Sequence, residues 1–490
     1  MIVLMLENRS FDHIFGFRPG VEGLKGNESN LLDPTKPESD TNPAFFVSNG
    51  APYKVLAGEG PSHSINGSNV QLCNWKDGPD AQHPMLNNGF VHNYNNELTL
   101  ADRVPNPGQP VIRVVMEGFP PSQLPSINAL ADSFCICDHW FSEVPGPTQP
   151  NRLYMHAATS AGYAHNVWSQ KFDVPTIYNH LQDAGCTWAT YEFDQNEVRE
   201  FNQVSAQSQN FKDFSAFAVD TRQGTLANYS FILPRFLNSK TGDMANSQHA
   251  PEDARYGDNL VADVYDALRA NEALWAKSVL IVIYDEHGGF YDHVIPPFSD
   301  VPNPDGINSP VAGDASFAPK FAFDRLGFRV PAVIASPWVK AGRVDSTRYQ
   351  HTSVLATLKN MFGLASFLTK RDASAFSFDH LFSEVSEPRT DTPLTLPRAP
   401  LPVMTAPATS AHNPANHPLD ATQKDIVTGV HALTVAAHPA GPPVEDLPDN
   451  QGDASDFIKA RFAKQFGPHG APGTVPGKPA ARRRGAASKK

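Results

Sequence analysis

Continuous runs of apolar, β-branched residues recur along the chain and predict buried β-strands. The runs are Ile2–Leu6, Trp188–Phe193, Ser278–Tyr284 and Val330–Ser336. Uninterrupted apolar runs, in place of alternating apolar and polar positions, are typical of strands that are covered on both faces of a mostly parallel sheet. We therefore expect these four runs to form the centre of such a sheet.

Between these runs the apolar positions recur with a helical period. Five residues share one face of a predicted helix: Leu260, Val261, Val264, Tyr265 and Leu268. Residues 353–362 repeat the pattern. Alternating strands and helices predict an α/β sandwich with a mostly parallel central sheet. Residues 17–125 hold few regular periods and many Gly, Pro, Asn and Ser residues, so we expect long functional loops over the C-terminal edge of the sheet.

The pattern changes near residue 385. Residues 381–420 carry eight prolines and almost no periodicity, which predicts an extended strap. One short helix is expected around Asp453–Gln465, followed by a disordered tail that is rich in Gly, Pro and cations. The expected division of the chain is a main α/β domain, a strap with a docking helix, and a basic tail: residues 1–385, 386–466 and 467–490.

Composition and charge narrow the functional class. Apolar residues make up 40% of the chain and charged residues 18%, which is enough for a large core. The net charge of −12 makes the body a poor non-specific binder of nucleic acid, so no nucleic-acid partner is expected. No run of about 18 uncharged apolar residues occurs, so no transmembrane segment is expected. The basic tail could contact lipid surfaces peripherally, although a solvated end is favoured.

The N-terminus and the cysteines bear on the cellular compartment. Residues 1–15 lack the charged leader, the long apolar region and the cleavage site of a signal peptide. A cytoplasmic protein is therefore expected, unless a leader precedes Met1. Four cysteines are too few for a disulfide scaffold, and Cys135 and Cys137 lack the usual spacing of a zinc-binding pair. We expect all four to be free or structural.

Polar pairs follow two of the predicted strands directly. Glu7 and Asn8 come after the first apolar run, and Asp285 and Glu286 come after the third. In an open α/β sheet, ligands bind beyond the carboxyl ends of the strands, so both pairs are expected at one edge. Adjacent carboxylates repel one another unless a cation lies between them. The alternative is that each pair lies in a turn with its acids exposed to solvent. This alternative is disfavoured because both pairs directly follow predicted core strands.

A proline-rich loop and scattered histidines supply the remaining candidate groups. The rigid turn PGPTQPNR could present the Thr148 hydroxyl, and Arg152 within it could hold an anion. His63, His249 and His351 stand in polar, loop-like contexts, where we expect at least one general acid or base. Taken singly, the turn could be only a proline-rich loop, and each histidine could be structural.

Together these groups predict one chemistry. One divalent metal cation, of unidentified element, would have mainly oxygen ligands: Glu7, Asn8, Asp285, Glu286 and the hydroxyl of Thr148. Such a contact would ionise the hydroxyl, which is otherwise a weak nucleophile. Histidines would protonate the leaving alcohol and hold the phosphoryl oxygens. The predicted reaction is hydrolysis of a phosphate ester through a covalent phospho-threonine.

Four blocks of the sequence resemble a known family. MIVLMLENRSFDHIFG, DHWFSEVPGPTQPNRLYMHAATSAG, SQHAPEDARYGDN and VIYDEHGGFYDHV are similar to bacterial and plant phosphoesterases that include non-haemolytic, phosphatidylcholine-type phospholipase C and acid phosphatase A. The resemblance runs from Met1 to about residue 365 and implies an alkaline-phosphatase-like fold. It also implies specific roles: Glu7, Asn8, Asp285 and Glu286 as metal ligands, Thr148 as the nucleophile, and His63 and His249 as site histidines.

The resemblance leaves the substrate open. Phospholipase C-type cleavage of a phospholipid or a small phosphodiester is favoured over the activity of a broad-specificity acid phosphatase with the same residues. A non-catalytic metal-binding protein on the same fold is the alternative of another class, and it is disfavoured because Thr148 and the ligand acids are all present. Thr148 also stands where sulfatases carry the cysteine that becomes formylglycine, which disfavours sulfatase activity.

Overall fold

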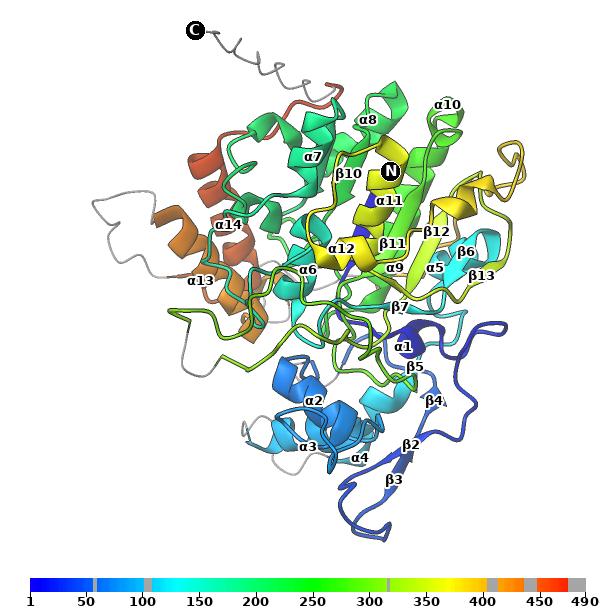
Figure 1. The fold of residues 1–490 in the computed structure, drawn as a ribbon, viewed down its shortest axis with the longest axis vertical. Helices are drawn as coiled ribbons and strands as arrows, with labels where there is room; N and C mark the ends of the chain where they lie inside the picture. The colour runs from blue at the N-terminus through cyan, green and yellow to red at the C-terminus, as the bar shows by residue number, and fades with distance from the viewer. Residues whose placement is uncertain (56–59, 101–107, 315–317, 403–412, 436–446, 475–490) are drawn as a thin grey trace, which may run out of the picture.

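The molecule is organised around an eight-stranded β-sheet (Figure 1). The computed structural model describes residues 1–55, 60–100, 108–314, 318–402, 413–435 and 447–474. The strands follow the order β13-β6-β12-β11-β1-β10-β8-β9 across the sheet. Their bounds are β1 (Ile2–Leu6), β6 (Cys135–Cys137), β8 (Trp188–Glu192), β9 (Phe211–Asp213), β10 (Tyr229–Ile232), β11 (Leu280–Tyr284), β12 (Ala332–Ala335) and β13 (Arg343–Asp345).

Neighbouring strands run parallel except at β12, which is antiparallel to both β11 and β6. The predicted α/β class with a mostly parallel central sheet is therefore confirmed. The four apolar runs correspond to β1, β8, β11 and β12. β6, β9, β10 and β13 were not predicted: each has only three or four residues, and none was recognised within a longer apolar run of the kind that revealed the equally short β12.

Two groups of helices sandwich the sheet, and for this reason every residue of β1 and β11 is buried. One group packs around the long helix α9: α5 (Pro125–Ser133), α8 (Ser215–Gln223), α9 (Ala254–Arg269) and α10 (Glu272–Trp275). The other packs around α11: α6 (Thr148–Ala157), α7 (Ile177–Asp183), α11 (Thr352–Phe362) and α12 (Lys370–Ser374). Both predicted helices are present, as α9 and α11.

Residues 17–125 lie at the C-terminal edge of the sheet, as expected, but they are not only loops (Figure 1). They contain α2 (Ile65–Cys73), α3 (Phe90–Leu100), α4 (Gln109–Arg113) and a hairpin of β2 (Ser29–Leu31) and β3 (Ala44–Phe46). These elements share a second apolar core that also includes Phe290 and Phe328 of the main body, and the rings of Phe90 and Phe328 lie 5.1 Å apart. Asn, Gly and Ser in α2 and α3 lower the intrinsic helix propensity, so tertiary packing stabilises these helices.

The C-terminal region begins as an extended segment along α9 and continues as two helices. Tyr265 of α9 donates a hydrogen bond to the Pro393 carbonyl (2.7 Å), and Arg398 pairs with two acids of the same helix. The helix expected around Asp453–Gln465 lies within α14 (Gln451–Phe466). A second helix, α13 (Ala421–Val435), was not expected.

Residues 467–474, the first part of the expected disordered tail, lie against β9. The Gly470 amide donates to the Phe211 carbonyl (2.8 Å), and Lys212 Nζ donates to the Thr474 carbonyl (2.7 Å). Residues 475–490 lie outside the described part of the chain. These hydrogen bonds to backbone carbonyls hold the short segment in place. No local pattern in the sequence predicts them.

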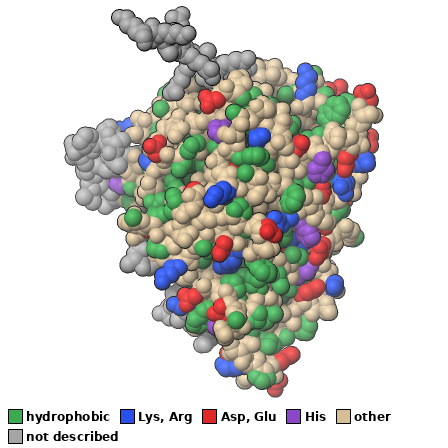
Figure 2. Space-filling model, in the orientation of Figure 1, with side chains coloured by type: hydrophobic (Ala, Val, Ile, Leu, Met, Phe, Trp, Pro, Cys, Tyr) green, Lys and Arg blue, Asp and Glu red, His purple; other side chains and the backbone are tan. Residues whose placement is uncertain are grey.

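Three further features concern the cysteines, the membrane-spanning potential of the helices, and the charge on the surface. All four cysteines are free, and Cys73, Cys135 and Cys137 are buried. Among the described helices, none combines the length and the apolar character needed to cross a membrane. On the face shown in Figure 2, acidic and basic side chains are intermixed.

Candidate active site

The first predicted pair, Glu7 and Asn8, emerges at the carboxyl end of β1. Asn8 adopts a left-handed backbone conformation (φ 58°), which asparagine tolerates better than most residues. This turn lets the Asn8 amide donate to Asp285 Oδ1 (3.0 Å), at the end of the neighbouring strand. The side chains of Glu7 and Asn8 are both buried.

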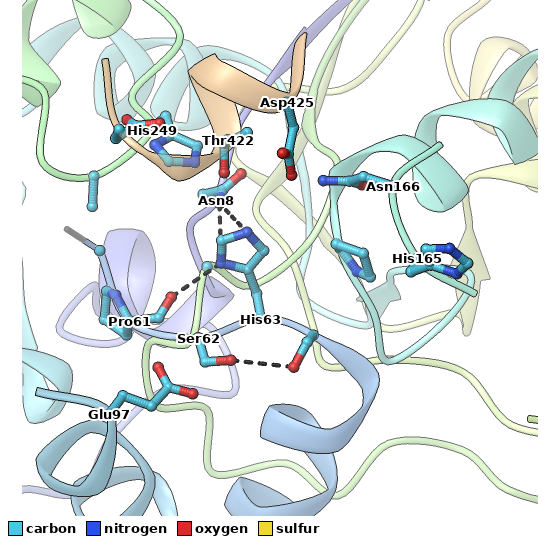
Figure 3. A pocket seen from close by; sticks show the side chains of 16 residues that line it. Asn8, Pro61, Ser62, His63, Glu97, His165, Asn166, His249, Thr422 and Asp425 are labelled. Atoms are coloured by element: carbon cyan, nitrogen blue, oxygen red, sulfur yellow. Dashed lines mark hydrogen bonds between the residues drawn. The ribbon is translucent and has the colours of Figure 1, made fainter. Parts of the chain in front are cut away.

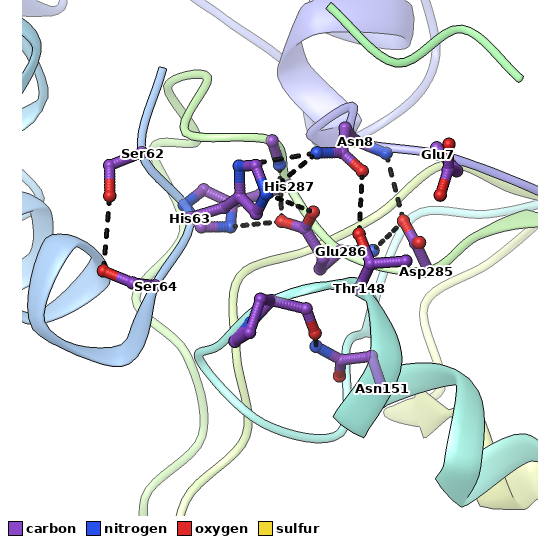
Figure 4. Close-up of polar contacts among 12 residues, drawn as sticks. Glu7, Asn8, Ser62, His63, Ser64, Thr148, Asn151, Asp285, Glu286 and His287 are labelled. Carbon is purple, nitrogen blue, oxygen red and sulfur yellow. Dashed lines mark hydrogen bonds and ion pairs between the residues drawn. The ribbon is translucent and has the colours of Figure 1, made fainter. Parts of the chain in front are cut away.

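The second pair, Asp285 and Glu286, emerges beside the first. β1 and β11 are parallel, with Leu6 opposite Tyr284, so the residues that follow each strand must be neighbours. The Glu286 amide donates to Asp285 Oδ1 (2.7 Å), and the Gly288 amide donates to Glu286 Oε2 (2.7 Å). Figure 4 shows these acids facing Asn8 and Thr148. The structure therefore brings the four predicted ligand residues together.

Gly288 makes this approach of the two strand ends possible. It has a positive φ of 65°, and a Cβ added to it would lie 2.1 Å from the Asn8 carbonyl oxygen. Any other residue would push the two turns apart. Gly288, the first glycine of the DEHGG sequence, thus allows its own backbone to approach the backbone of Asn8 closely.

Thr148 is the first residue of α6 and is fully buried. Its hydroxyl lies 3.4 Å from Asn8 Oδ1, to which it donates (Figure 4). Asn151 holds the preceding turn, because its side-chain amide donates to the carbonyls of Gly146 (2.9 Å) and Pro147 (3.1 Å). The hydroxyl thus sits at a helix N-terminus, where free backbone amides favour negative charge.

Arg152, one turn further along α6, faces the carboxylates. Its Nε donates to Asp285 Oδ2 (3.1 Å), and its NH1 group donates to Glu197 (3.4 Å). NH2 donates to two carbonyls of β1 and lies 3.8 Å from Glu7 Oε1. This guanidinium balances buried acids, and its expected contact with a bound anion stays a prediction.

The three predicted histidines take different positions. His63 lies 3.3 Å from Asn8 Nδ2 and 3.9 Å from Glu286 Oε1, and its ring meets that of His249 edge-on at 5.9 Å. Burial lowers the pKa of His249 to about 3, and its Nε2 has no hydrogen-bond partner among the described residues. His351 instead takes the Trp140 indole hydrogen bond at Nδ1 and contacts the Asp285 carbonyl through Nε2 (2.6 Å), so it supports the backbone.

The acids at the strand ends are poorly compensated. Burial raises the pKa of Glu7 and of Glu286 well above the usual range, and for Glu286 the neighbouring Asp285 raises it further. Glu7 Oε1 and Glu286 Oε1 accept no hydrogen bond from any described residue. Buried carboxylate oxygens without partners fit a divalent cation, which prefers oxygen ligands.

A second acidic cluster was missed by the sequence analysis. Within the described ranges, one group of three ligand side chains has its ligand atoms within 4.8 Å of one another, a spacing that a metal could bridge: Asp12, Asp292 and His293. Arg329 already occupies this cluster, donating to Asp12 Oδ1 and Asp292 Oδ1 at 2.9 Å each. No local sequence signal marks a contact of this kind.

Glu197 was also missed, although a signal existed. It follows β8 after a few residues, so the strand-end rule that identified Glu7 applies to it as well. Glu197 pairs with His156 (3.2 Å) in addition to Arg152. It therefore extends the buried polar network behind the site.

A cavity of about 620 Å³ opens over these groups (Figure 3). Asn8, His63 and His249 line it, and Thr148 lies just beyond the lining residue Pro147. The wall also includes Asp420, which precedes α13, and Thr422 and Asp425 from α13 itself.

The chain is similar to known proteins in sequence and in fold. Residues 1–365 match the Phosphoesterase family. Non-specific phospholipase C3 of Arabidopsis thaliana is 37% identical over 426 residues, covering 82% of this chain and 76% of the relative. Phospholipase C B of Mycobacterium tuberculosis is 28% identical over 451 residues, covering 80% and 79%. A solved protein of the alkaline phosphatase superfamily from Vibrio parahaemolyticus aligns with 51% of this chain and 63% of its own at 12% identity, with a TM-score of 0.30.

Proposed function

From the premise that the chain belongs to the Phosphoesterase family and is a hydrolase of phosphoester bonds, we propose that it cleaves phosphodiesters as a phospholipase C does. Relatives named phospholipase C imply phospholipid substrates. The observation that carries the proposal is the Thr148 hydroxyl at the start of α6, which donates to Asn8, a residue that lines the cavity. A volume of about 620 Å³ is large enough for a phosphate with two substituents.

Thr148 is the nucleophile of the proposed reaction. Its Oγ attacks phosphorus while the bond from phosphorus to the leaving alcohol breaks, which produces a phospho-threonine. Water then attacks the same phosphorus, breaks the bond to Oγ and restores the hydroxyl. The N-terminus of α6 favours the negative charge that develops beside Thr148.

Glu7, Asn8, Asp285 and Glu286 would hold one divalent cation. Support comes from the unpartnered oxygens of Glu7 and Glu286 and from the convergence of all four residues beside Thr148. A bound cation would supply a lowered pKa for the hydroxyl and compensation for the negative charge of the phosphate. Arg152 orients Asp285 and keeps the excess charge of the acids tolerable.

His249 is the proposed general acid, with His63 beside it to hold the phosphoryl oxygens. In the free cavity the lowered pKa of His249 leaves the ring neutral near pH 7. A bound phosphate adds negative charge next to the ring and so raises the pKa. The ring can then carry the proton that the leaving alkoxide takes.

The test is turnover of p-nitrophenylphosphorylcholine and of p-nitrophenyl phosphate, each with and without a chelator. We expect faster hydrolysis of the diester and loss of activity on chelation. Acid quenching during turnover, followed by mass spectrometry of the peptide that contains Thr148, should detect the phospho-threonine. A preference for the monoester would instead support a broad phosphatase, and hydrolysis of neither ester would support the non-catalytic alternative.

A further inference from the structure

The residue that precedes His249 has an unusual backbone conformation. Gln248 has a φ of 72°, in the left-handed region that residues with a long side chain rarely adopt. Such a conformation costs free energy and persists only where neighbouring groups hold the residue firmly. Gln248 is buried, whereas His249 beside it is half-buried and lines the cavity (Figure 3). The groups that hold Gln248 therefore define how the chain enters the cavity wall.

The side chain of Gln248 is anchored at both atoms of its amide. The Tyr284 hydroxyl, at the end of β11, donates to Oε1, and Nε2 donates to the Ala254 carbonyl at the start of α9 (2.7 Å). Gly257 of α9 leaves room for this side chain, because a Cβ added there would lie 2.3 Å from Gln248 Cγ. The amide is thus fixed between a central strand and a helix that covers the sheet.

The main chain of the same segment is held by groups that follow β1. The Glu7 amide donates to the Ser247 carbonyl (2.8 Å), and Arg9 Nε donates to the Gln248 carbonyl (2.9 Å). Arg9 is itself held, because its guanidinium carbon lies 4.7 Å from the centre of the Phe290 ring. Two consecutive carbonyls ahead of His249 are therefore tied to the strand end that carries the proposed metal ligands.

The ring of His249 depends on this backbone for its direction. Its Nε2 has no hydrogen-bond partner among the described residues, so no contact at that atom orients the ring. Resting on the proposed function, in which His249 is the general acid, we infer that Gln248 is a positioning residue for His249. Its anchored, left-handed backbone directs Nε2 toward the leaving alcohol, although Gln248 itself touches no substrate.

Gln248→Asn tests the inference, because asparagine tolerates the left-handed backbone but is one methylene too short to reach both anchors. The readout is the kcat/KM for p-nitrophenylphosphorylcholine divided by the kcat/KM for glycerophosphocholine. Both substrates release phosphorylcholine, but only the glycerol alkoxide needs a proton as it leaves. The ratio should rise about fivefold in the variant. A loss of stability alone would lower both values and leave the ratio unchanged.

A double variant shows whether the effect passes through His249. His249→Ala alone should raise the ratio at least about tenfold. Adding Gln248→Asn to it should raise the ratio no further, because the residue that Gln248 positions is then absent.

Tyr284→Phe keeps the inference testable if Gln248→Asn fails to fold, since it removes one anchor and changes the shape little. It should raise the ratio about twofold. Tyr265→Phe is the matched control. It also removes a hydroxyl that donates to a carbonyl, that of Pro393, but Tyr265 does not line the cavity, and the ratio should stay unchanged.

An unchanged ratio in folded Gln248→Asn protein, or in Tyr284→Phe where only that variant folds, overturns the inference and leaves the proposed function intact. A further rise in the double variant, or an equal rise in Tyr265→Phe, overturns it as well. An unchanged ratio in His249→Ala overturns both the inference and the proposed general acid.

Discussion

Two acidic clusters lie at the same edge of the sheet, and they are balanced in opposite ways. Each combines an acid from the segment after β1 with acid from the segment after β11: one residue in the first cluster and two in the second. In the first, which we call the Arg329 cluster, Asp12 and Asp292 share the guanidinium of Arg329, and His293 Nδ1 lies 2.7 Å from Asp12. The remaining Arg329 donors reach the Glu22 and Asp138 carbonyls.

The second, the Glu286 cluster, consists of Glu7, Asp285 and Glu286 and has only Arg152 as a permanent cation among the described residues around it. Arg152 is also shared with Glu197, and two carboxylate oxygens of the cluster remain without a hydrogen bond. The ligand atoms of the Arg329 cluster lie within 4.8 Å of one another, yet its two carboxylates are already paired with Arg329, and Asp12 also with His293. The comparison teaches that unsatisfied charge, more than close spacing, indicates where a cation belongs.

The largest expected effect of a substitution is the loss of activity at Thr148. Thr148→Ala should lower kcat about a thousandfold or more, because covalent catalysis is lost. Thr148→Ser keeps a hydroxyl at the same place and should retain part of the activity. Steady-state kinetics on p-nitrophenylphosphorylcholine measures both, and thermal unfolding checks the fold. Retention of about a tenth of the wild-type kcat by Thr148→Ala would remove the proposed nucleophile.

The next largest effect should fall on stability, at the Arg329 cluster. Arg329→Gln leaves two buried carboxylates without their cation and should cost about 3–5 kcal/mol of unfolding free energy. Arg398 also pairs with two acids, Asp263 and Asp266, but at the surface, so Arg398→Gln should cost at most about 1 kcal/mol. Denaturant unfolding of the two variants gives the comparison. Similar losses would mean that the Arg329 cluster is not structural in the way described.

Metal binding should distinguish the clusters directly. Glu286→Gln should weaken the affinity for a divalent cation by about a hundredfold or more, whereas Asp292→Asn should leave it unchanged. Calorimetric titration of chelator-treated protein with Mg²⁺, Ca²⁺, Mn²⁺ and Zn²⁺ measures both effects. If Asp292→Asn abolishes binding and Glu286→Gln does not, the assignment of the two clusters is reversed.

The pH dependence of the same titration has a defined sign. In the metal-free protein, burial raises the pKa of Glu7 and Glu286, so these carboxyls keep protons to a higher pH than usual. A cation must displace those protons, and its affinity should therefore rise with pH and fall as pH decreases. Titrations in two buffers of different ionisation enthalpy should detect the released protons. Affinity that is flat between about pH 6 and about pH 8 would contradict the raised pKa values.

The smallest expected effect is the change in rate on substituting His249 or His293. His249→Ala should slow hydrolysis of alkyl phosphodiesters at least about tenfold more than hydrolysis of p-nitrophenyl esters, because p-nitrophenolate leaves without a proton. His293 is committed to Asp12, so His293→Ala should affect both substrate types equally. Equal losses on the two substrate types in His249→Ala would leave that residue a binding role alone.

The sequence predicted the parts of the site that follow long apolar runs. β1 and β11 are continuous apolar strands, so the residues after them could be placed at one edge. The pairing of Asp12 with Arg329 could not be predicted, because it joins positions 317 residues apart without a local pattern. The orientation of Arg152 could not be predicted either, because its two acidic partners, Asp285 and Glu197, follow different strands and only the tertiary fold brings both to one guanidinium.

The C-terminal region was harder to predict, for a local reason. The α13 sequence ATQKDIVTGVHALTV contains Gly429 and several β-branched residues, which lower the helix propensity. The same glycine provides the close packing on Trp168 that stabilises the helix. Gly429 thus lowers the helix propensity of the segment and also allows a close tertiary contact. Sequence periodicity can detect only the first of these effects.

The adjacency of β1 and β11 also sets when the site can form. The hydrogen bond from the Asn8 amide to Asp285 spans 277 residues, so the strand made first must await a partner from far along the chain. Contacts of such high sequence separation form late, since a long loop must close before they become favourable. During synthesis from the N-terminus, the nascent chain carries Glu7 and Thr148 well before Asp285 leaves the ribosome. The proposed site can therefore assemble only after more than half of the 490-residue chain has been made.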